Sequence, residues 1–315
     1  MEFGPLVESV APPANLTGYS VEKIARDIYN PGHFLFNAGG ALLSYSPNDG
    51  VAVLAGNVAE NGLKDGSAAD ARFSLLVDFT QYNETMIAIV DIKNHCIRKL
   101  DTKLKLVSHL IGSCHFFSNP SSEYVDFEEP GKNVSADTDI LNHPTRILYV
   151  SSRNYFLTYD LLNNLIIKVD MYTNTAALLI PHLHSESLPK LAGLIVDRVE
   201  RHLYASHDYG ITKIDLETLD SELIVGTIAK PDENMEMFIP ISAGPFADAY
   251  ITTLTSLQWL IQDAAIVAVS GQDNEAIAVL DLVNEEVMFL CNGKLHNLHG
   301  YSKCATCYLT REGFF

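Results

Sequence analysis

Residues 91–101 read DIKNHCIRKLD, and residues 160–170 read DLLNNLIIKVD. Each stretch has Asp at its first position, Asn three residues later, Ile six residues later and Asp ten residues later. Two weaker copies, YASHDYGITKID and SGQDNEAIAVLD, end at Asp215 and Asp281. Because the same spacing returns along the chain, the sequence indicates an internal repeat.

Short apolar runs surround each copy of this pattern. They hold five to seven residues, are rich in Ile, Val, Leu, Tyr and Phe, and are separated by Asn, Asp and Gly. This texture is typical of β-strands. Each repeat then has one strand before the pattern, two within it and one after it. Such units bury both faces only by stacking around an axis, so the sequence predicts an all-β protein, a β-propeller of four-stranded antiparallel blades.

The Asp and Asn of the pattern have a structural role in this interpretation. The turn between the second and third strands is tight, and Asp and Asn side chains bind free backbone N–H groups there. In the weaker copies, Ala205 and Gly271 align with the first Asp. The predicted structural turn residues are Asp91, Asn94, Asp160, Asn163 and Asn274.

The first strong copy and its surroundings resemble an NHL repeat. The matching residues are GNVAENGLKDGSAADARFSLLVDF, at 56–79, followed by IAIVDIKNHCIRKLD. Residues 142–180 resemble the repeat fairly well, and residues 190–226 and 251–293 resemble it more weakly. The resemblance implies a propeller that usually has six blades. The sequence itself contains five recognisable hairpins, so five blades stay an alternative, and family precedent favours six.

The residues before the first repeat, 1–32, are expected to form a separate lead. Ser20 is a helix-capping residue type, Ile24 and Ile28 fall on one helical face, and a Pro-Gly pair follows, which predicts a short helix. The propeller then spans residues 33–315. The C-terminal stretch KCATCYLTREGFF reads as a strand, which would close the ring by completing the first blade.

The charge balance limits the partners. Lys and Arg number 21 against 39 Asp and Glu, which makes the formal net charge −18. So acidic a chain repels phosphate backbones, and nucleic acid is excluded as a predicted partner. No apolar run approaches the length of a membrane-spanning helix. The predicted partners are proteins, within a larger assembly.

Two observations bear on the compartment. N-x-Ser/Thr sequons at Asn15, Asn83 and Asn133 are candidate glycosylation sites, and they agree with an extracellular or luminal location. The first ten residues lack the pattern of a secretory signal, so the alternatives are a cytoplasmic protein or a chain that begins after a removed segment. The disulfide state stays open for Cys96, Cys114, Cys291, Cys304 and Cys307.

Two long segments, 113–139 and 227–249, read as insertions between blades. Both mix acidic residues with aromatic or Met side chains, a composition that suits contact with a partly basic and partly apolar protein surface. Because loops on a rigid scaffold commonly carry function, the sequence predicts a non-enzymatic binding or assembly module. The candidate binding residues are Phe116, Phe117, Tyr124, Phe127, Met235, Met237 and Phe238.

The alternative function is a metal-dependent propeller lyase or hydrolase with an axial active site. Relatives of similar shape hold a metal at the central channel, and the residues with suitable positions are Asn142, His143, Asp248 and Asp78. The sequence contains no G-x-S-x-G nucleophile motif and no P-loop. Cys304 and Cys307 form a lone C-x-x-C, which by itself does not indicate zinc. No catalytic residue, metal or cofactor is therefore predicted.

Overall fold

The computed structural model describes residues 19, 21–114, 133–179, 191–207, 210–226, 243–249, 254–261, 264–270 and 276–292. Regular structure in these ranges consists of β-strands and two 3-10 turns of three residues each. The predicted all-β class is confirmed for this part of the chain. None of its helical turns is long and apolar enough to cross a membrane.

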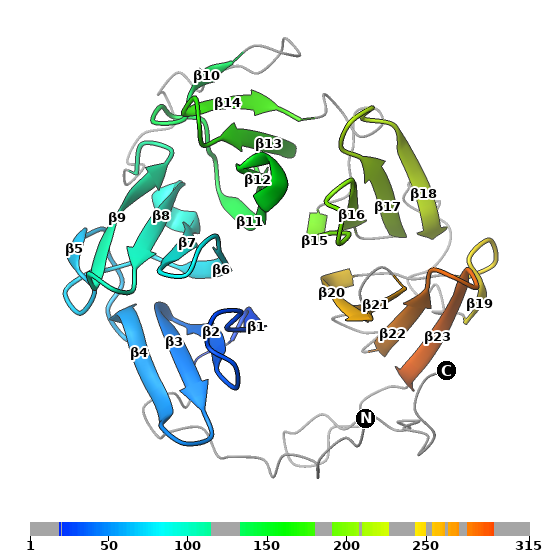
Figure 1. The fold of residues 1–315 in the computed structure, drawn as a ribbon, viewed down its shortest axis with the longest axis horizontal. Helices are drawn as coiled ribbons and strands as arrows, with labels where there is room; N and C mark the ends of the chain where they lie inside the picture. The colour runs from blue at the N-terminus through cyan, green and yellow to red at the C-terminus, as the bar shows by residue number, and fades with distance from the viewer. Residues whose placement is uncertain are drawn as a thin grey trace, which may run out of the picture. The chain divides into compact units, whose positions relative to one another are not determined.

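The chain divides into two compact units. The first comprises Met1–Val125 and Ser135–Ile147, and the second comprises Asp126–Val134 and Leu148–Phe315. Two of the three boundaries fall within strands of one sheet, β10 and β11. Each unit is built from small antiparallel sheets (Figure 1). Strands that follow one another in the sequence are hydrogen-bonded neighbours, except that in three sheets a short first strand pairs with the last strand of the sheet.

The first unit contains two sheets. The first sheet has the order β1 (Ile24–Arg26), β2 (Phe34–Ala38), β3 (Gly40–Ser46) and β4 (Gly50–Asn57). The second sheet has the order β5 (Gly66–Ser67), β9 (Leu106–Ile111), β8 (Cys96–Asp101), β7 (Met86–Asp91) and β6 (Leu76–Gln81). An apolar core that includes Leu42, Phe73 and Ile89 joins the two sheets.

The remaining three sheets lie mainly in the second unit. The third sheet has the order β10 (Val134–Ser135), β14 (Thr175–Leu178), β13 (Leu165–Asp170), β12 (Tyr155–Asp160) and β11 (Pro144–Val150). The fourth is β15 (Leu191–Val196), β16 (His202–His207), β17 (Gly210–Asp215) and β18 (Ser221–Gly226). The fifth is β19 (Gly244–Pro245), β23 (Glu286–Asn292), β22 (Ala276–Asp281), β21 (Ala265–Ser270) and β20 (Leu254–Ile261).

Apolar cores also join neighbouring sheets of the second unit. Tyr159 of the third sheet and Leu203 of the fourth belong to one buried cluster. Ile211 of the fourth sheet and Leu280 of the fifth belong to another. Within each unit, neighbouring sheets therefore bury apolar side chains against each other, which explains why their strands are apolar enough to be recognised from the sequence.

The Asp that closes each repeat makes the same turn in all four. Its carboxylate accepts hydrogen bonds from the backbone N–H groups two and three residues further on. The residue four positions on has a positive φ, between 52° and 64°. This geometry returns the chain from the third strand to the fourth. The four Asp residues are Asp101, Asp170, Asp215 and Asp281.

The helix expected in the lead segment is wrong. Ile24–Arg26 form strand β1, and Ile24 lies opposite Phe36 of β2. The Asp27 carboxylate then accepts the N–H groups of Tyr29 and Asn30, which makes a turn where the helix would continue. The apolar spacing fits a helix, but pairing with β2 satisfies the backbone hydrogen bonds of this short segment and overrides the local preference.

Strand β1 also takes the place beside β2 that we expected the C-terminal stretch to fill. Residues 293–315 lie outside the described part of the chain. Five sheets form within the described residues. The two expected insertions are shorter than predicted, because residues 134–135 and 244–245 at their ends form the edge strands β10 and β19.

Candidate functional site

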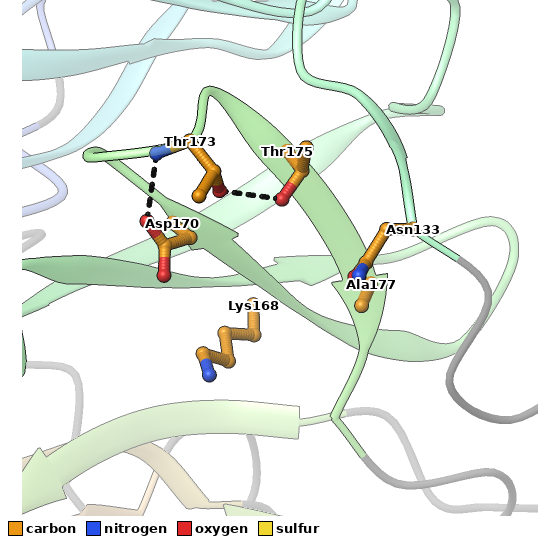
Figure 2. Close-up of a pocket in the computed structure, with 6 residues that line it drawn as sticks. All are labelled: Asn133, Lys168, Asp170, Thr173, Thr175 and Ala177. Atoms are coloured by element: carbon orange, nitrogen blue, oxygen red, sulfur yellow. Dashed lines mark hydrogen bonds between the residues drawn. The ribbon is translucent and has the colours of Figure 1, made fainter.

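A hollow of 280 Å³ opens on the third sheet (Figure 2). Lys168 and Asp170 come from β13, and two residues of β14 lie directly opposite them, Ala177 across from Lys168 and Thr175 across from Asp170. All four side chains therefore share one face of the sheet. Thr173 in the β13–β14 turn and Asn133, just before β10, complete the lining.

The polar groups of this hollow are held in place by the sheet. The Lys168 ammonium lies 4.8 Å from the centre of the Tyr155 ring, and no carboxylate of the described residues lies within ion-pair distance of it. The Asp170 carboxylate accepts the N–H groups of Tyr172 and Thr173 at 2.8 and 3.0 Å. These backbone hydrogen bonds hold the pKa of Asp170 below its usual value, and the bond from the Thr173 N–H has the largest effect.

The hydroxyl groups of Thr173 and Thr175 are hydrogen-bonded to each other at 2.7 Å. Figure 2 shows the six labelled side chains around a common space. The hollow thus offers one ammonium, one carboxylate, two hydroxyls and one amide, a set that can both donate and accept hydrogen bonds. The sequence alone does not indicate this site, because strand pairing brings its residues together.

The predicted turn residues make the contacts of tight turns. Between β7 and β8, Asn94 donates to the Asp91 carboxylate at 2.7 Å. Between β12 and β13, Asn163 donates to the Asp160 carboxylate at 2.9 Å. The residue that follows each Asn has a positive φ. Asn274, the fifth predicted turn residue, lies outside the described residues.

The Asp91 turn carries a buried charge cluster. Arg98 is fully buried and donates to the carboxylates of Asp65, at 2.6 Å, and Asp91, at 3.3 Å. Its guanidinium also lies 4.5 Å from the centre of the Phe73 ring. Burial raises the pKa of Asp91, and hydrogen bonds from Asn94 and from the Ser74 N–H oppose that rise. Arg98 is therefore a core residue with no surface available to a ligand.

The third repeat departs from our alignment. His207, not Ala205, ends the second strand of this sheet, as Asp91 and Asp160 end theirs. The hairpin here is two residues shorter, because His207 pairs directly with Gly210. His207 is only 4% exposed, and burial lowers its pKa to about 4. Sequence spacing alone could not detect this shortening.

The residues considered for a metal centre have other contacts. The buried Asp78 carboxylate binds Lys23 and accepts the N–H groups of Phe79 and Ile147. His143 packs edge-on against His95, with ring centres 4.4 Å apart, and burial lowers the pKa of His143. The two other residues considered were Asn142, which is hydrogen-bonded to His143, and the exposed Asp248.

Within the described ranges, no three His, Cys, Asp or Glu side chains are grouped so that they could hold a metal ion. The zinc-type residues Cys304 and Cys307 lie outside these ranges. The hollow on the third sheet and the two segments between sheets therefore remain as candidate functional sites.

The seven candidate binding residues of those segments lie outside the described residues. The first segment begins at Cys114, which is disulfide-bonded to Cys96 of β8, a pairing that the sequence left open. It ends at Asn133 and Val134, where β10 begins. Asn83 and Asn133, two of the candidate glycosylation sites, are exposed. The third, Asn15, lies outside the described residues.

Comparison with known proteins adds a likeness of fold. No family model and no curated protein matches the chain. An auxiliary nutrient binding protein from Bacteroides ovatus is similar over 89% of this chain, with a TM-score of 0.58 and 10% identity. This chain spans 63% of the length of that protein. At this identity the likeness concerns the fold alone.

A structural genomics protein of unknown function from Bacteroides thetaiotaomicron is also similar. The match covers 90% of this chain and 89% of that protein, with a TM-score of 0.41 and 10% identity.

Proposed function

We propose that this chain is a non-enzymatic β-propeller of the NHL type that acts as a protein-binding module in an extracytoplasmic compartment. The propeller is supported by hydrogen bonds that recur between neighbouring sheets. In the first unit, Gln81 bonds the Asp27 carboxylate and the Ile28 N–H. In the second unit, Glu200 accepts the N–H groups of Ser151 and Ser152. The first contact joins the residues after β1 to the end of β6, and the second joins the residues after β11 to those after β15.

Within this proposal six blades are favoured, and five blades are the alternative. Six blades, the number that the NHL resemblance implies, require one sheet beyond the five in the described residues. Five blades require none. Proteins of this shape present rigid faces built from the loops between strands. Contacts with other molecules are accordingly expected at those loops.

The binding role is supported by the anchoring of both ends of the segment 114–133. A disulfide to β8 anchors its start, and the edge strand β10 anchors its end. Anchoring both ends limits the conformational entropy that the segment loses when it binds, which favours affinity. Its aromatic residues, Phe116, Phe117, Tyr124 and Phe127, are then the contact residues, and Met235, Met237 and Phe238 play this part in the second segment.

The proposed compartment rests on the disulfide. Disulfides persist in oxidising compartments and are rare in the cytosol, and Cys96–Cys114 is one. The auxiliary nutrient binding protein of similar fold supports the proposed binding role. Asn15, Asn83 and Asn133 are proposed as glycosylation sites where the host attaches N-linked glycans.

The test replaces the aromatic residues of the first segment. A quadruple Ser variant at Phe116, Phe117, Tyr124 and Phe127 is used to capture proteins from an extract of the source organism. We expect at least one protein that wild type captures to be lost, while the melting temperature changes little. Tyr172→Ser is the matched control, because Tyr172 is an aromatic residue that is 81% exposed in the described structure. If both variants capture what wild type does, the first segment is not the binding surface.

A further inference from the structure

We propose that the hollow on the third sheet is a subsite for one neutral sugar residue. Of its lining residues, Asn133 also belongs to the first segment assigned to protein binding, and the others lie on β13, β14 and the turn between them. Its shape is set by strand pairing, because Lys168 and Asp170 on β13 face Ala177 and Thr175 on β14. Backbone hydrogen bonds hold these positions before any ligand arrives, so little entropy is lost in forming the site.

The charges of the hollow select against ions. Lys168 brings one positive charge and Asp170 brings one negative charge to the same face of β13. An anion near Lys168 would meet the Asp170 carboxylate, and a cation near Asp170 would meet the Lys168 ammonium. The formal net charge of −18 further disfavours an anion. The ligand that suits this pair of charges is polar and neutral.

The hydrogen-bonding groups fit a polyhydroxylated ligand. The Lys168 ammonium only donates and the Asp170 carboxylate only accepts, whereas the hydroxyls of Thr173 and Thr175 do both. A sugar hydroxyl also donates and accepts, so neighbouring hydroxyls on one ring can satisfy such an alternating set. The Ala177 methyl group leaves a small apolar area for the C–H face of the ring.

The size limits the ligand to one ring. A volume of 280 Å³ lies just below the range of about 300–1,000 Å³ that is usual for small-molecule sites. An oligosaccharide or a peptide would extend beyond the lining residues. One hexose or one N-acetylhexosamine residue matches the space.

The sugar has two conceivable sources. It is either a free sugar or the first residue of a glycan on Asn133, since Asn133 both lines the hollow and begins the sequon Asn-Val-Ser. The chemistry recognised is the same in both cases. The experiment therefore has one arm for each source.

The first arm uses the full chain from a host that attaches no N-glycans. Saturation-transfer NMR is recorded with glucose, galactose, mannose and N-acetylglucosamine, each at millimolar concentration. We expect at least one sugar to bind, and Lys168→Met to weaken that binding about tenfold, because a charged donor is lost. Ala177→Leu, which fills the hollow without removing a hydrogen bond, should have a similar effect.

Lys213→Met is the matched control. Lys213 lies two residues before Asp215, as Lys168 lies two residues before Asp170, but it does not line the hollow. Its replacement should leave sugar binding unchanged. Near-UV circular dichroism of every variant establishes that the fold is retained.

The second arm uses the chain secreted from a eukaryotic host. The rate at which an amidase releases the glycan from Asn133 is measured on the folded protein by peptide mass spectrometry. We expect release to be about tenfold faster in Ala177→Leu than in wild type, because the first sugar would no longer be held. The glycan on Asn83, an exposed sequon of the second sheet, serves as the internal control and should be released at one rate in both proteins.

Each outcome of the two arms either supports or overturns the proposal. The proposal is supported if either arm gives its expected difference between wild type and the hollow variants. It is overturned if no sugar binds and the release rate at Asn133 is the same in both proteins. It is also overturned if a sugar binds but Lys168→Met and Ala177→Leu bind it as wild type does, and the release rate at Asn133 is again the same in both proteins.

Discussion

Arg98 shows how one side chain can have a role that its sequence context hides. It stands beside Lys99, Lys103 and Lys105, which suggests a basic surface, yet it is fully buried beneath Phe73. Strand β8 directs alternate side chains to opposite faces, and Arg98 is on the inner one. A buried guanidinium is tolerated only when its donors are satisfied, and those of Arg98 bind Asp65, Asp91 and backbone carbonyl groups.

Replacing Arg98 should therefore be costly. We expect Arg98→Met to lower the free energy of unfolding by about 3–5 kcal/mol, because the Asp91 carboxylate would stay buried without its counter-charge. Urea unfolding measures this loss. The double variant Arg98→Met with Asp91→Asn should lose less than the sum of the two single changes. Lys103→Met, at an exposed position of the same hairpin, is the control, and an equal loss there would contradict the assignment.

His207 makes stability depend on pH. Burial lowers its pKa to about 4, so the folded protein binds this proton less readily than the unfolded chain does. The stabilisation is complete above the unfolded pKa of about 6.5, and up to about 3 kcal/mol of it is lost as the pH falls toward 4. Urea unfolding across this range should show a shallower dependence for His207→Gln. The same slope in wild type and variant would refute the prediction, and His33→Gln is the matched control.

At the scale of the element, the repeated turn between the third and fourth strands is the most regular feature. An Asp begins it and a residue with positive φ ends it, namely Lys105, Asn174, Leu219 or Glu285. In the first sheet, Ser46 and Gly50 occupy these two places. The hydrogen bonds are local, which is why the spacing of the closing Asp could be read from the sequence.

Leu219 is the least suited of these residues to its conformation. Its φ is 64°, a region that is costly for a residue with a bulky side chain, and its side chain is 41% exposed. We expect Leu219→Gly to raise the free energy of unfolding by about 0.5–1 kcal/mol. Asn174→Gly is the comparison, because Asn already tolerates a positive φ and the gain should be smaller. Thermal unfolding of both variants measures the difference, and a loss of stability in Leu219→Gly would contradict it.

At the scale of the molecule, each unit consists of small sheets that share apolar cores with their neighbours along the chain. Contacts of this kind make stability a sum of sheet and interface contributions, as in other repeat architectures. The disulfide adds a covalent link in the first unit. It joins Cys96, at the start of β8, to Cys114, which lies three residues after the end of β9.

Removing this link should destabilise the first unit. Cys96 and Cys114 are 18 residues apart, and closing a loop of that length stabilises a protein by about 3 kcal/mol. We expect a double Cys96→Ser and Cys114→Ser variant to melt at a lower temperature than wild type in the absence of reductant. With a strong reductant, the difference should shrink as wild type loses the disulfide. If wild type and variant melt together without reductant, the disulfide does not stabilise the fold.

The sequence by itself determined the strand-rich composition, the repeat and its closing turns, because strand alternation and Asp–N–H hydrogen bonds act over a few residues. Tertiary contacts decided where the structure departs from those local preferences. Pairing with β2 turned Ile24–Arg26 into a strand, and a shortened hairpin put His207 in the place of an Asp. The hollow formed only when β10, β13 and β14 came together. Such features depend on register between distant segments, and no local spacing encodes that register.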